Sequence, residues 1–289
     1  MVIENIFYGK LVFFNATDNL ELQGFLLEPT RKTVVAVIFV HGGGGDFLWR
    51  AMLSASKKLN RNGIAFLAIN TRGANIVRKF YKGRKSIRIG YAYEKFTDSE
   101  KDIWGALRFL RKLGYKKVVL VGNSYGCHKI AYFIKRNRSS RQVKGLVFLS
   151  ADDQLERMEK YHKEKLNEIY SYCTKLVKCG DGNNIVMDRT GVYITAKKFI
   201  SLFKTGTLET SIFDYRGGLR YLRDIDLPKL FVFASGDNFL LHDNNFYVRS
   251  VSHNISKSSV VFIKSTDHSL RDRLPAVLEE ITAFVKNTI

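Results

Sequence analysis

The sequence predicts an α/β fold in which a mostly parallel, twisted sheet of about eight strands carries helices on both faces. Two observations indicate this fold. Short runs rich in Val and Ile alternate with amphipathic stretches along most of the chain, and these runs are apolar throughout, as strands covered on both faces are. With 289 residues, of which 45% are hydrophobic, the chain is long enough to bury a sizeable core.

The first part of the chain supplies a hairpin and the first parallel strands. Residues 11–16 and 20–27 flank a Thr-Asp-Asn turn and predict the hairpin. The continuous apolar run at 34–40 predicts a central strand, and a helix at 51–60 leads to the next strand at 64–69.

The elements that follow keep the same alternation. Ile103, Leu107 and Leu110 lie at helical spacing and predict an amphipathic helix over 99–113. The other core elements are expected as strands at 117–121, 143–149, 230–234 and 260–263, and as helices at 127–135 and 273–286.

The alternation stops between two well-patterned parts of the chain. The Val/Ile-rich runs are absent from 152–226, so we interpret this segment as a helical lid insertion. The segments 1–151 and 227–289 are then the two parts of the α/β core.

Within the insertion, the sequence predicts a long charged helix at 154–176 and shorter helices near 195–203 and 217–223. Its aromatic residues either line an apolar pocket or form the small core of the lid itself. Those considered are Tyr193, Phe199 and Phe203.

The chain is strongly basic, with 47 Lys and Arg against 27 Asp and Glu and a formal net charge of +20. The densest basic stretch, at 78–88, is expected to be a loop. Because the sequence lacks a helix-turn-helix, an RNP motif and a zinc finger, we expect no specific nucleic-acid binding. The charge instead indicates a generally cationic surface or a preference for anionic substrates.

Cysteine usage and hydropathy suggest a cytoplasmic protein. Cys127, Cys173 and Cys179 are expected to be reduced thiols, with a Cys173–Cys179 bridge as the alternative. Neither zinc spacing nor another metal or cofactor motif is present. The first residues do not have the pattern of a signal peptide, and no apolar run approaches the ~20 residues of a membrane span.

The most informative motif is Gly122-Asn123-Ser124-Tyr125-Gly126, which lies between a predicted strand and a predicted helix. A sharp turn between such elements raises a serine hydroxyl above the sheet, and the glycines permit the turn because they have no side chain to clash. We therefore predict that Ser124 is a nucleophile, in preference to a serine that merely caps the helix.

A glycine run, His41-Gly-Gly-Gly-Gly-Asp-Phe47, follows the central strand. Acyl transfer needs N–H donors for an oxyanion, and a glycine run exposes such groups. We predict an oxyanion hole formed by the Gly43 and Tyr125 N–H groups, with Gly44 near the substrate. The run does not match a phosphate-binding loop, and His41 is expected to organise the loop.

A serine nucleophile needs a base and an acid. His268 follows the strand at 260–263 and stands where the order Ser, Asp, His places the base. Asp237 follows the strand at 230–234 and is the predicted acid. The other acids considered are Asp152, Asp153 and Asp267, of which Asp267 is adjacent to the base.

With these residues in this order, the chain resembles the α/β-hydrolase superfamily over nearly its full length. The pair Arg72-Gly73 is similar to the superfamily's Asp-x-Arg-Gly loop, although Asn70 stands where Asp is common. The resemblance implies the α/β-hydrolase fold and a serine esterase-like activity. We also expect Arg72 and Tyr93 to reach the mouth of the site.

Three further segments resemble one hydrolase family that includes fungal esterases acting on hydroxamate siderophores. They are Gly90-Tyr91 before Asp98, Ser124-Tyr-Gly-Cys127, and the segment 193–202 of the insertion, Tyr-Ile-Thr-Ala-Lys-Lys-Phe-Ile-Ser-Leu. This resemblance implies siderophore esters as one substrate class.

The sequence therefore predicts a monomeric or homodimeric serine hydrolase that cleaves a small carboxylic ester, which is anionic if the positive charge serves the substrate. It needs no cofactor. An acyltransferase, a thioesterase or a peptidase could use the same residues. The alternative from another class is a catalytically silent relative that binds a partner.

Overall fold

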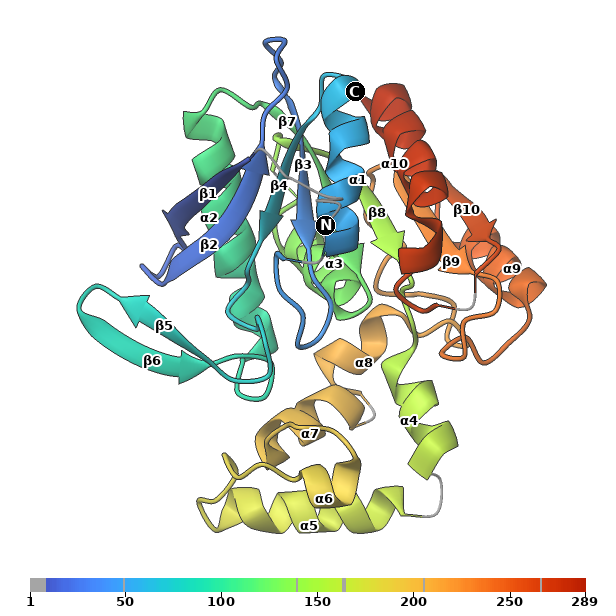
Figure 1. Cartoon of the computed structure of the whole chain (residues 1–289). Coiled ribbons are helices and arrows are strands. Elements are labelled where there is room, and N and C mark those ends of the chain that lie inside the picture. The colour runs from blue at the N-terminus through green and yellow to red at the C-terminus, as the bar shows by residue number, and fades with distance from the viewer. Residues whose placement is uncertain (1–8, 49, 139, 163–164, 205, 266) are drawn as a thin grey trace, which may run out of the picture.

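The computed structural model describes residues 9–48, 50–138, 140–162, 165–204, 206–265 and 267–289. An eight-stranded sheet in the order β1-β2-β4-β3-β7-β8-β9-β10 forms its centre, as predicted (Figure 1). From β4 to β10 neighbouring strands are parallel, and β1 and β2 pair antiparallel at one edge. The strands are β1 (Lys10–Asn15), β2 (Glu21–Leu27), β3 (Val35–Val40), β4 (Ala65–Ile69), β7 (Lys117–Asn123), β8 (Val143–Leu149), β9 (Lys229–Ala234) and β10 (Ser258–Ile263).

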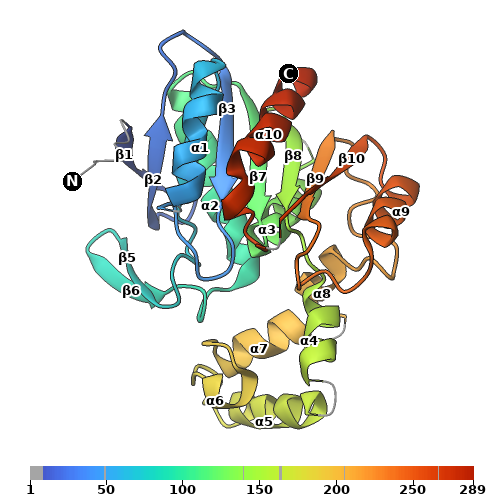
Figure 2. The same ribbon diagram turned by 45° about the vertical axis from the view of Figure 1, so that its right-hand side comes forward.

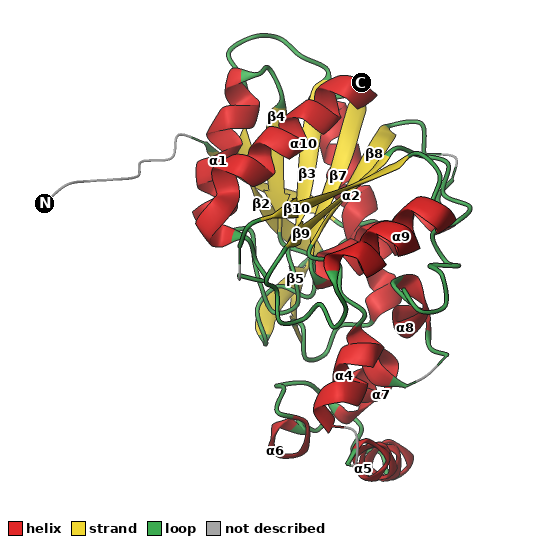
Figure 3. Ribbon diagram, turned by 90° about the vertical axis from the view of Figure 1, so that its right-hand side faces the viewer, coloured by secondary structure: helices red, strands yellow, loops and turns green. Residues whose placement is uncertain are grey.

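Helices cover both faces of this sheet. Alternation along β3 shows why the central strands are apolar throughout: Val37 and Phe39 enter one core, and Ile38 and Val40 enter the other. The helices α1 and α10 lie over one face, and α2 and α9 lie over the other (Figure 3). The covering helices are α1 (Arg50–Arg61), α2 (Ser99–Lys112), α3 (Tyr125–Arg136), α9 (Asn244–Asn254) and α10 (Leu274–Thr288), with the 3-10 turns η1 (Phe96–Asp98) and η2 (Arg271–Arg273) before α2 and α10.

The chain between β8 and β9 forms a helical unit that lies below the sheet in Figures 1 and 2. Its helices are α4 (Gln154–His162), α5 (Leu166–Lys178), α6 (Met187–Thr190), α7 (Ala196–Phe203) and α8 (Leu208–Ile212).

Two helix predictions for this unit were wrong. The expected helix at 154–176 is two helices, because α5 packs on α7 while Met158 of α4 faces a cavity near the sheet. One straight helix could not both pack on α7 and place Met158 at the cavity. The expected helix at 217–223 is a series of turns, because Gly218 and Leu219 both adopt positive φ.

The basic stretch at 78–88 is also not the loop that we expected. It forms an antiparallel hairpin of β5 (Arg78–Lys82) and β6 (Lys85–Ile89), with Gly83 at φ +58 in the turn. The charges obscured the strand alternation, in which Phe80 alone is buried among the residues of the two strands.

No helix in the described ranges is both long enough and apolar enough to cross a membrane. All three cysteines are free thiols, so the alternative Cys173–Cys179 bridge is absent from the structure; Cys127 and Cys173 are buried.

Candidate active site

Ser124 occupies a strained turn between β7 and α3. Its backbone has φ 50° and ψ −120°, a conformation that residues with a side chain rarely adopt. The turn is held on both sides, because Ser124 N–H donates to the Leu149 carbonyl at 2.8 Å and the Ser124 carbonyl accepts from Cys127 N–H at 2.8 Å.

The two glycines of the motif are required by close backbone packing. A Cβ on Gly126 would lie 2.2 Å from the Val40 carbonyl oxygen, and a Cβ on Gly122 would lie 2.6 Å from the Cys127 nitrogen. Neither contact can be relieved by moving a flexible side chain. The sequence therefore brings α3 against β3 closely enough to place Ser124 next to the glycine run.

The structure brings Ser124, His268 and Asp237 into one hydrogen-bonded chain. His268 Nε2 lies 3.0 Å from Ser124 Oγ, and His268 Nδ1 lies 2.6 Å from Asp237 Oδ2. The Asp237 carboxylate is fully buried and fixes the imidazole with its proton on Nδ1. Nε2 is then an acceptor for the serine proton. The second oxygen of Asp237 accepts from the Phe239 N–H at 2.8 Å, which holds the carboxylate in place.

The other acids considered for this role have different partners. Asp152 lies 3.2 Å from Arg157 Nε, and Asp153 accepts from the Glu156 N–H at the start of α4. Burial raises the pKa of Asp153 to about 7. Asp267 accepts from Arg271 Nε at 2.9 Å.

The glycine run lies directly beside the serine. A Cβ on Gly42 would lie 3.3 Å from Ser124 Cβ, and Gly43 and Tyr125 both line the cavity above Ser124. Tyr125 is the first residue of α3, where an N–H has no intrahelical acceptor. Gly43 N–H donates to no acceptor in the described part of the chain.

A cavity of about 950 Å³ opens above Ser124 and His268, between the core and the helical unit. Its apolar wall comes from the loops after β4 and β6, from α4, and from the segments around α6, α7 and Asp237. The wall residues are Ile76, Tyr91, Met158, Tyr161, Val192, Phe203 and Phe239. The cavity is also lined by Arg157, His162 and Arg271, and Asp46 adds a carboxylate to its wall.

Three predicted substrate contacts lie outside this cavity. The guanidinium of Arg72 is buried and pairs with Asp102 at 2.8 Å and with Asp18 at 3.1 Å, so it anchors α2 to the hairpin β1–β2. Tyr93 lines a separate pocket, and Gly44 is absent from the cavity wall. A substrate role for these residues has no support in the geometry.

The aromatic residues of the helical unit divide between the two predicted alternatives. Phe199 is fully buried and packs against Phe203 and Tyr170 inside the unit. Phe203 also lines the cavity, whereas Tyr193 is exposed.

His41 organises the glycine run, as we expected. Its Nδ1–H donates to the Gly42 carbonyl at 2.8 Å, and its Nε2 accepts from Thr71 N–H at 3.2 Å. Burial, reinforced by the positive charge of Lys129, lowers the pKa of His41 to about 4. The imidazole is therefore neutral, as this hydrogen-bond pattern requires.

A buried charge cluster behind the serine turn was not predicted. Lys198 of α7 donates to Tyr125 Oη at 2.6 Å, and Glu94 lies 2.8 Å from Lys129 and 3.6 Å from Lys198. Burial alone would raise the pKa of Glu94, but the two ammonium groups outweigh it and lower the pKa below its ordinary value. The cluster joins the helical unit to the residue that follows Ser124.

Sequence reasoning also missed Phe239 and Arg157. The Phe239 ring packs on His268 at a centroid distance of 4.3 Å, and Arg157 lies 4.2 Å from the Phe239 ring centre. Phe239 follows Asp237 by two positions, which is a usable signal. The role of Arg157 depends on how α4 meets the core.

Comparisons with known proteins agree with this architecture. The family model for the alpha/beta hydrolase fold matches residues 35–280. Est1E from Butyrivibrio proteoclasticus, solved with ferulic acid bound, has a TM-score of 0.62 at 16% identity and covers 96% of this chain and 99% of its own.

Two further solved structures are similar over nearly their full length. Esterase Pf2001 from Pyrococcus furiosus has a TM-score of 0.60 at 16% identity, over 99% of this chain and 97% of that chain. Alpha/beta hydrolase domain-containing protein 10 from mouse has a TM-score of 0.63 at 14% identity, over 96% and 99%. Among curated proteins, none matches the sequence.

Proposed function

Because the chain belongs to the alpha/beta hydrolase fold family, we propose that it is a serine hydrolase that cleaves a carboxylic ester through an acyl-enzyme on Ser124. The observation that carries this proposal is the hydrogen-bonded chain from Asp237 through His268 to Ser124 Oγ, at 2.6 and 3.0 Å, which opens into the 950 Å³ cavity. Esterases among the structural relatives support the choice of an ester substrate.

In the proposed reaction, His268 Nε2 takes the proton of Ser124 as Oγ attacks the ester carbonyl carbon. The negative charge on the carbonyl oxygen is held by the N–H groups of Gly43 and Tyr125, each contributing about 3 kcal/mol to the barrier reduction, as in other acyl-transfer enzymes. His268 then protonates the leaving alcohol. Asp237 stays ionised and stabilises the imidazolium.

Water completes the cycle. His268 takes a proton from a water molecule, the resulting hydroxide attacks the acyl carbon, and the proton returns to Ser124 as the carboxylic acid leaves. We propose that the segment 152–226 acts as a lid, because Met158 of α4 and Phe203 of α7 close one side of the cavity. A dry cavity strengthens the interaction of the two N–H donors with the oxyanion.

The cavity also suggests the substrate class. Its apolar wall suits an acyl chain or an aromatic ring, and the guanidinium groups of Arg157 and Arg271, which already pair with Asp152 and Asp267 through Nε, suit an electron-rich polar substituent. Hydroxamate siderophore esters remain a prediction from the family resemblance. They can be assayed next to p-nitrophenyl esters of increasing acyl length.

The test compares Ser124→Ala with Ser269→Ala, a matched variant of a second serine on the cavity wall. We expect Ser124→Ala to abolish p-nitrophenyl ester turnover, and Ser269→Ala to retain most of it, with both variants melting at a temperature similar to that of the wild type. Undiminished turnover in Ser124→Ala would refute the proposal. Adding an alcohol or thiol and measuring the products separates hydrolysis from acyl transfer.

A further inference from the structure

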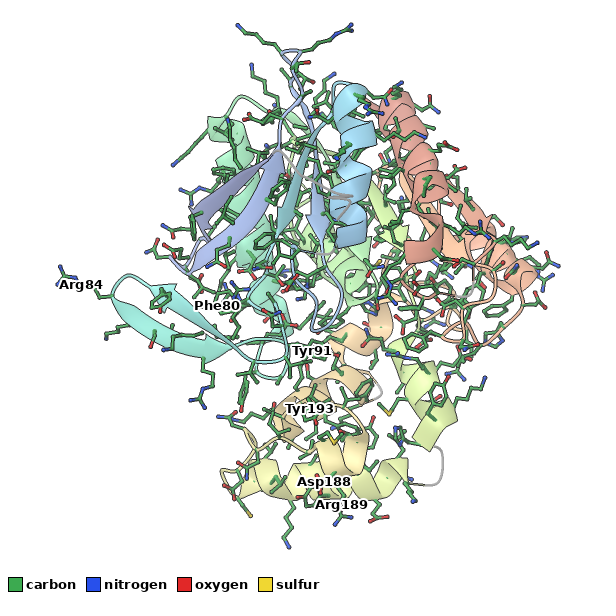
Figure 4. The ribbon with its side chains drawn as sticks, viewed as in Figure 1. Phe80, Arg84, Tyr91, Asp188, Arg189 and Tyr193 are labelled. Atoms are coloured by element: carbon green, nitrogen blue, oxygen red, sulfur yellow. The ribbon has the colours of Figure 1, made fainter. Side chains whose placement is uncertain are left out.

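The hairpin β5–β6 carries positive charge that ester cleavage does not use. Six of the eleven residues at 78–88 are Lys or Arg, and none is acidic. In Figure 4, Arg84 lies at the outer end of the hairpin, whereas Phe80 lies toward the body of the protein and is buried. The hairpin is therefore anchored by one face, and its other face is free to bind a ligand.

Strand register places like charges opposite each other. Lys79 pairs with Arg88, and Lys82 pairs with Lys85. Cβ atoms of directly opposed residues lie about 5 Å apart, and like charges at this position destabilise a hairpin. Within the described residues, neither Lys79 nor Arg88 has a carboxylate at ion-pair distance. An anion between them would relieve the repulsion.

The face with Lys79 and Arg88 is hollow. A cavity of about 530 Å³ lies between this face, the loop before η1 and the segment between α5 and α6. Its polar lining is Arg78, Lys79, Ser86, Arg88, Tyr93 and Asn183, and no acidic residue lines it in the described structure.

A third cation, Arg78, lies at the edge of this cavity, and neutral groups hold its side chain on the Phe80 face of the hairpin. Arg78 donates to Asn75 Oδ1 at 3.1 Å and to Gln23 Oε1, so its charge is not neutralised and its guanidinium is oriented. The cavity is thus lined by the ammonium group of Lys79, the guanidinium of Arg88, two hydroxyls and a carboxamide, with Arg78 at its edge, and no carboxylate lines it in the described residues. Forked guanidinium donors match phosphate oxygens.

We propose that this cavity is a binding site for a small anion that bears phosphate groups. The proposal does not depend on ester cleavage at Ser124. A cavity of this size suits a small molecule, because such sites typically have about 300–1,000 Å³. The donors come from three segments and converge on one hollow, whereas a nucleic-acid or membrane surface would use the exposed cations of the tip equally.

The hairpin offers a matched pair of double variants for the test. Lys79→Gln with Arg88→Gln removes two opposed charges from the cavity, and Lys82→Gln with Lys85→Gln removes two opposed charges from the other face of the hairpin. The probe is inorganic pyrophosphate, titrated into the wild-type protein and both variants by calorimetry at low ionic strength.

We expect saturable binding to the wild type, at least about tenfold weaker binding to the Lys79/Arg88 variant, and a change of less than about twofold in the Lys82/Lys85 variant. The Lys79/Arg88 variant without ligand should melt no lower than the wild type, because a repulsion is removed. An undiminished melting temperature would show that the weaker binding comes from the loss of the site and not from misfolding of the hairpin.

Two results would overturn the proposal. One is the absence of saturable pyrophosphate binding to the wild type. The other is an equal loss of affinity in both variants, together with equally weakened binding of duplex DNA, which would indicate a diffuse polyanion surface.

Vesicles that contain phosphatidic acid identify the source of the phosphate. Vesicle binding that is lost only in the Lys79/Arg88 variant supports the site with a lipid headgroup as ligand. Pyrophosphate binding without vesicle binding supports a soluble phosphate ester.

Discussion

Replacing Lys198 with Met is expected to weaken the contact between the helical unit and the serine turn. Lys198 Nζ donates to Tyr125 Oη at 2.6 Å and lies 3.6 Å from Glu94 Oε1, and 2% of its side chain is exposed. Methionine has a similar length and is apolar. The variant therefore removes the ammonium with little change in packing.

The expected loss follows from what remains after the substitution. A hydrogen bond to a charged group contributes about 1.5–3 kcal/mol, and removing one partner of a buried ion pair costs about 3–5 kcal/mol when the other charge is left alone. Glu94 is not left alone, because Lys129 Nζ stays 2.8 Å away. The variant also no longer buries an ammonium, so we expect a loss of about 2 kcal/mol in the free energy of unfolding.

Urea unfolding followed by circular dichroism measures this loss. The matched control is Lys197→Met, since Lys197 is the exposed neighbour of Lys198 on α7. Its unfolding free energy should change by less than about 0.5 kcal/mol. Equal unfolding midpoints for the two variants would refute the reasoning that Lys198 connects the helical unit to the turn.

Three further predictions follow from the site. Gly126→Ala should reduce both the soluble yield and the melting temperature, because its Cβ would lie 2.2 Å from the Val40 carbonyl; a melting temperature like that of the wild type would contradict the close packing. Asp237→Asn should lower kcat for a p-nitrophenyl ester by about 10⁴-fold while leaving the fold intact, as measured by steady-state kinetics and circular dichroism; an unchanged kcat would exclude Asp237 as the acid. Burial lowers the pKa of His128 from 6.5 to about 4. Between these two values the unfolded chain binds a proton that the folded chain does not, so the free energy of unfolding decreases as the pH falls. His128→Leu should remove roughly 3 kcal/mol of that decline, measured as unfolding free energy at pH 4 and pH 7; an unchanged pH dependence would show that His128 does not cause it.

Local patterns were enough to predict the sheet and the serine turn. The apolar run of β3 and the glycines around Ser124 each carry their own signal, because a buried strand and a tight turn constrain the residues within them. The proximity of His268 and Asp237 to Ser124 followed from chain order, since consecutive parallel strands end at the same edge of the sheet.

What the sequence did not predict depends on long-range contacts. The hairpin β5–β6 was predicted to be a loop because charged residues stand on both of its strands and on both of its faces. Among the strand residues only Phe80 is buried, so no apolar alternation marks the strands. Arg72 was assigned to the cavity mouth because nothing local shows that Asp102 and Asp18 lie opposite it. Lys198 could have been found, since it lies on the helical face next to the buried Phe199 and Leu202.

The proposed reaction requires that Ser124 Oγ forms the acyl-enzyme. The most direct measurement is the intact mass of the protein after treatment with a fluorophosphonate, followed by peptide mapping of the adduct. We expect one adduct, on Ser124, that forms slowly in His268→Ala and is absent from Ser124→Ala. An adduct on another serine, or labelling that persists in Ser124→Ala, would contradict it.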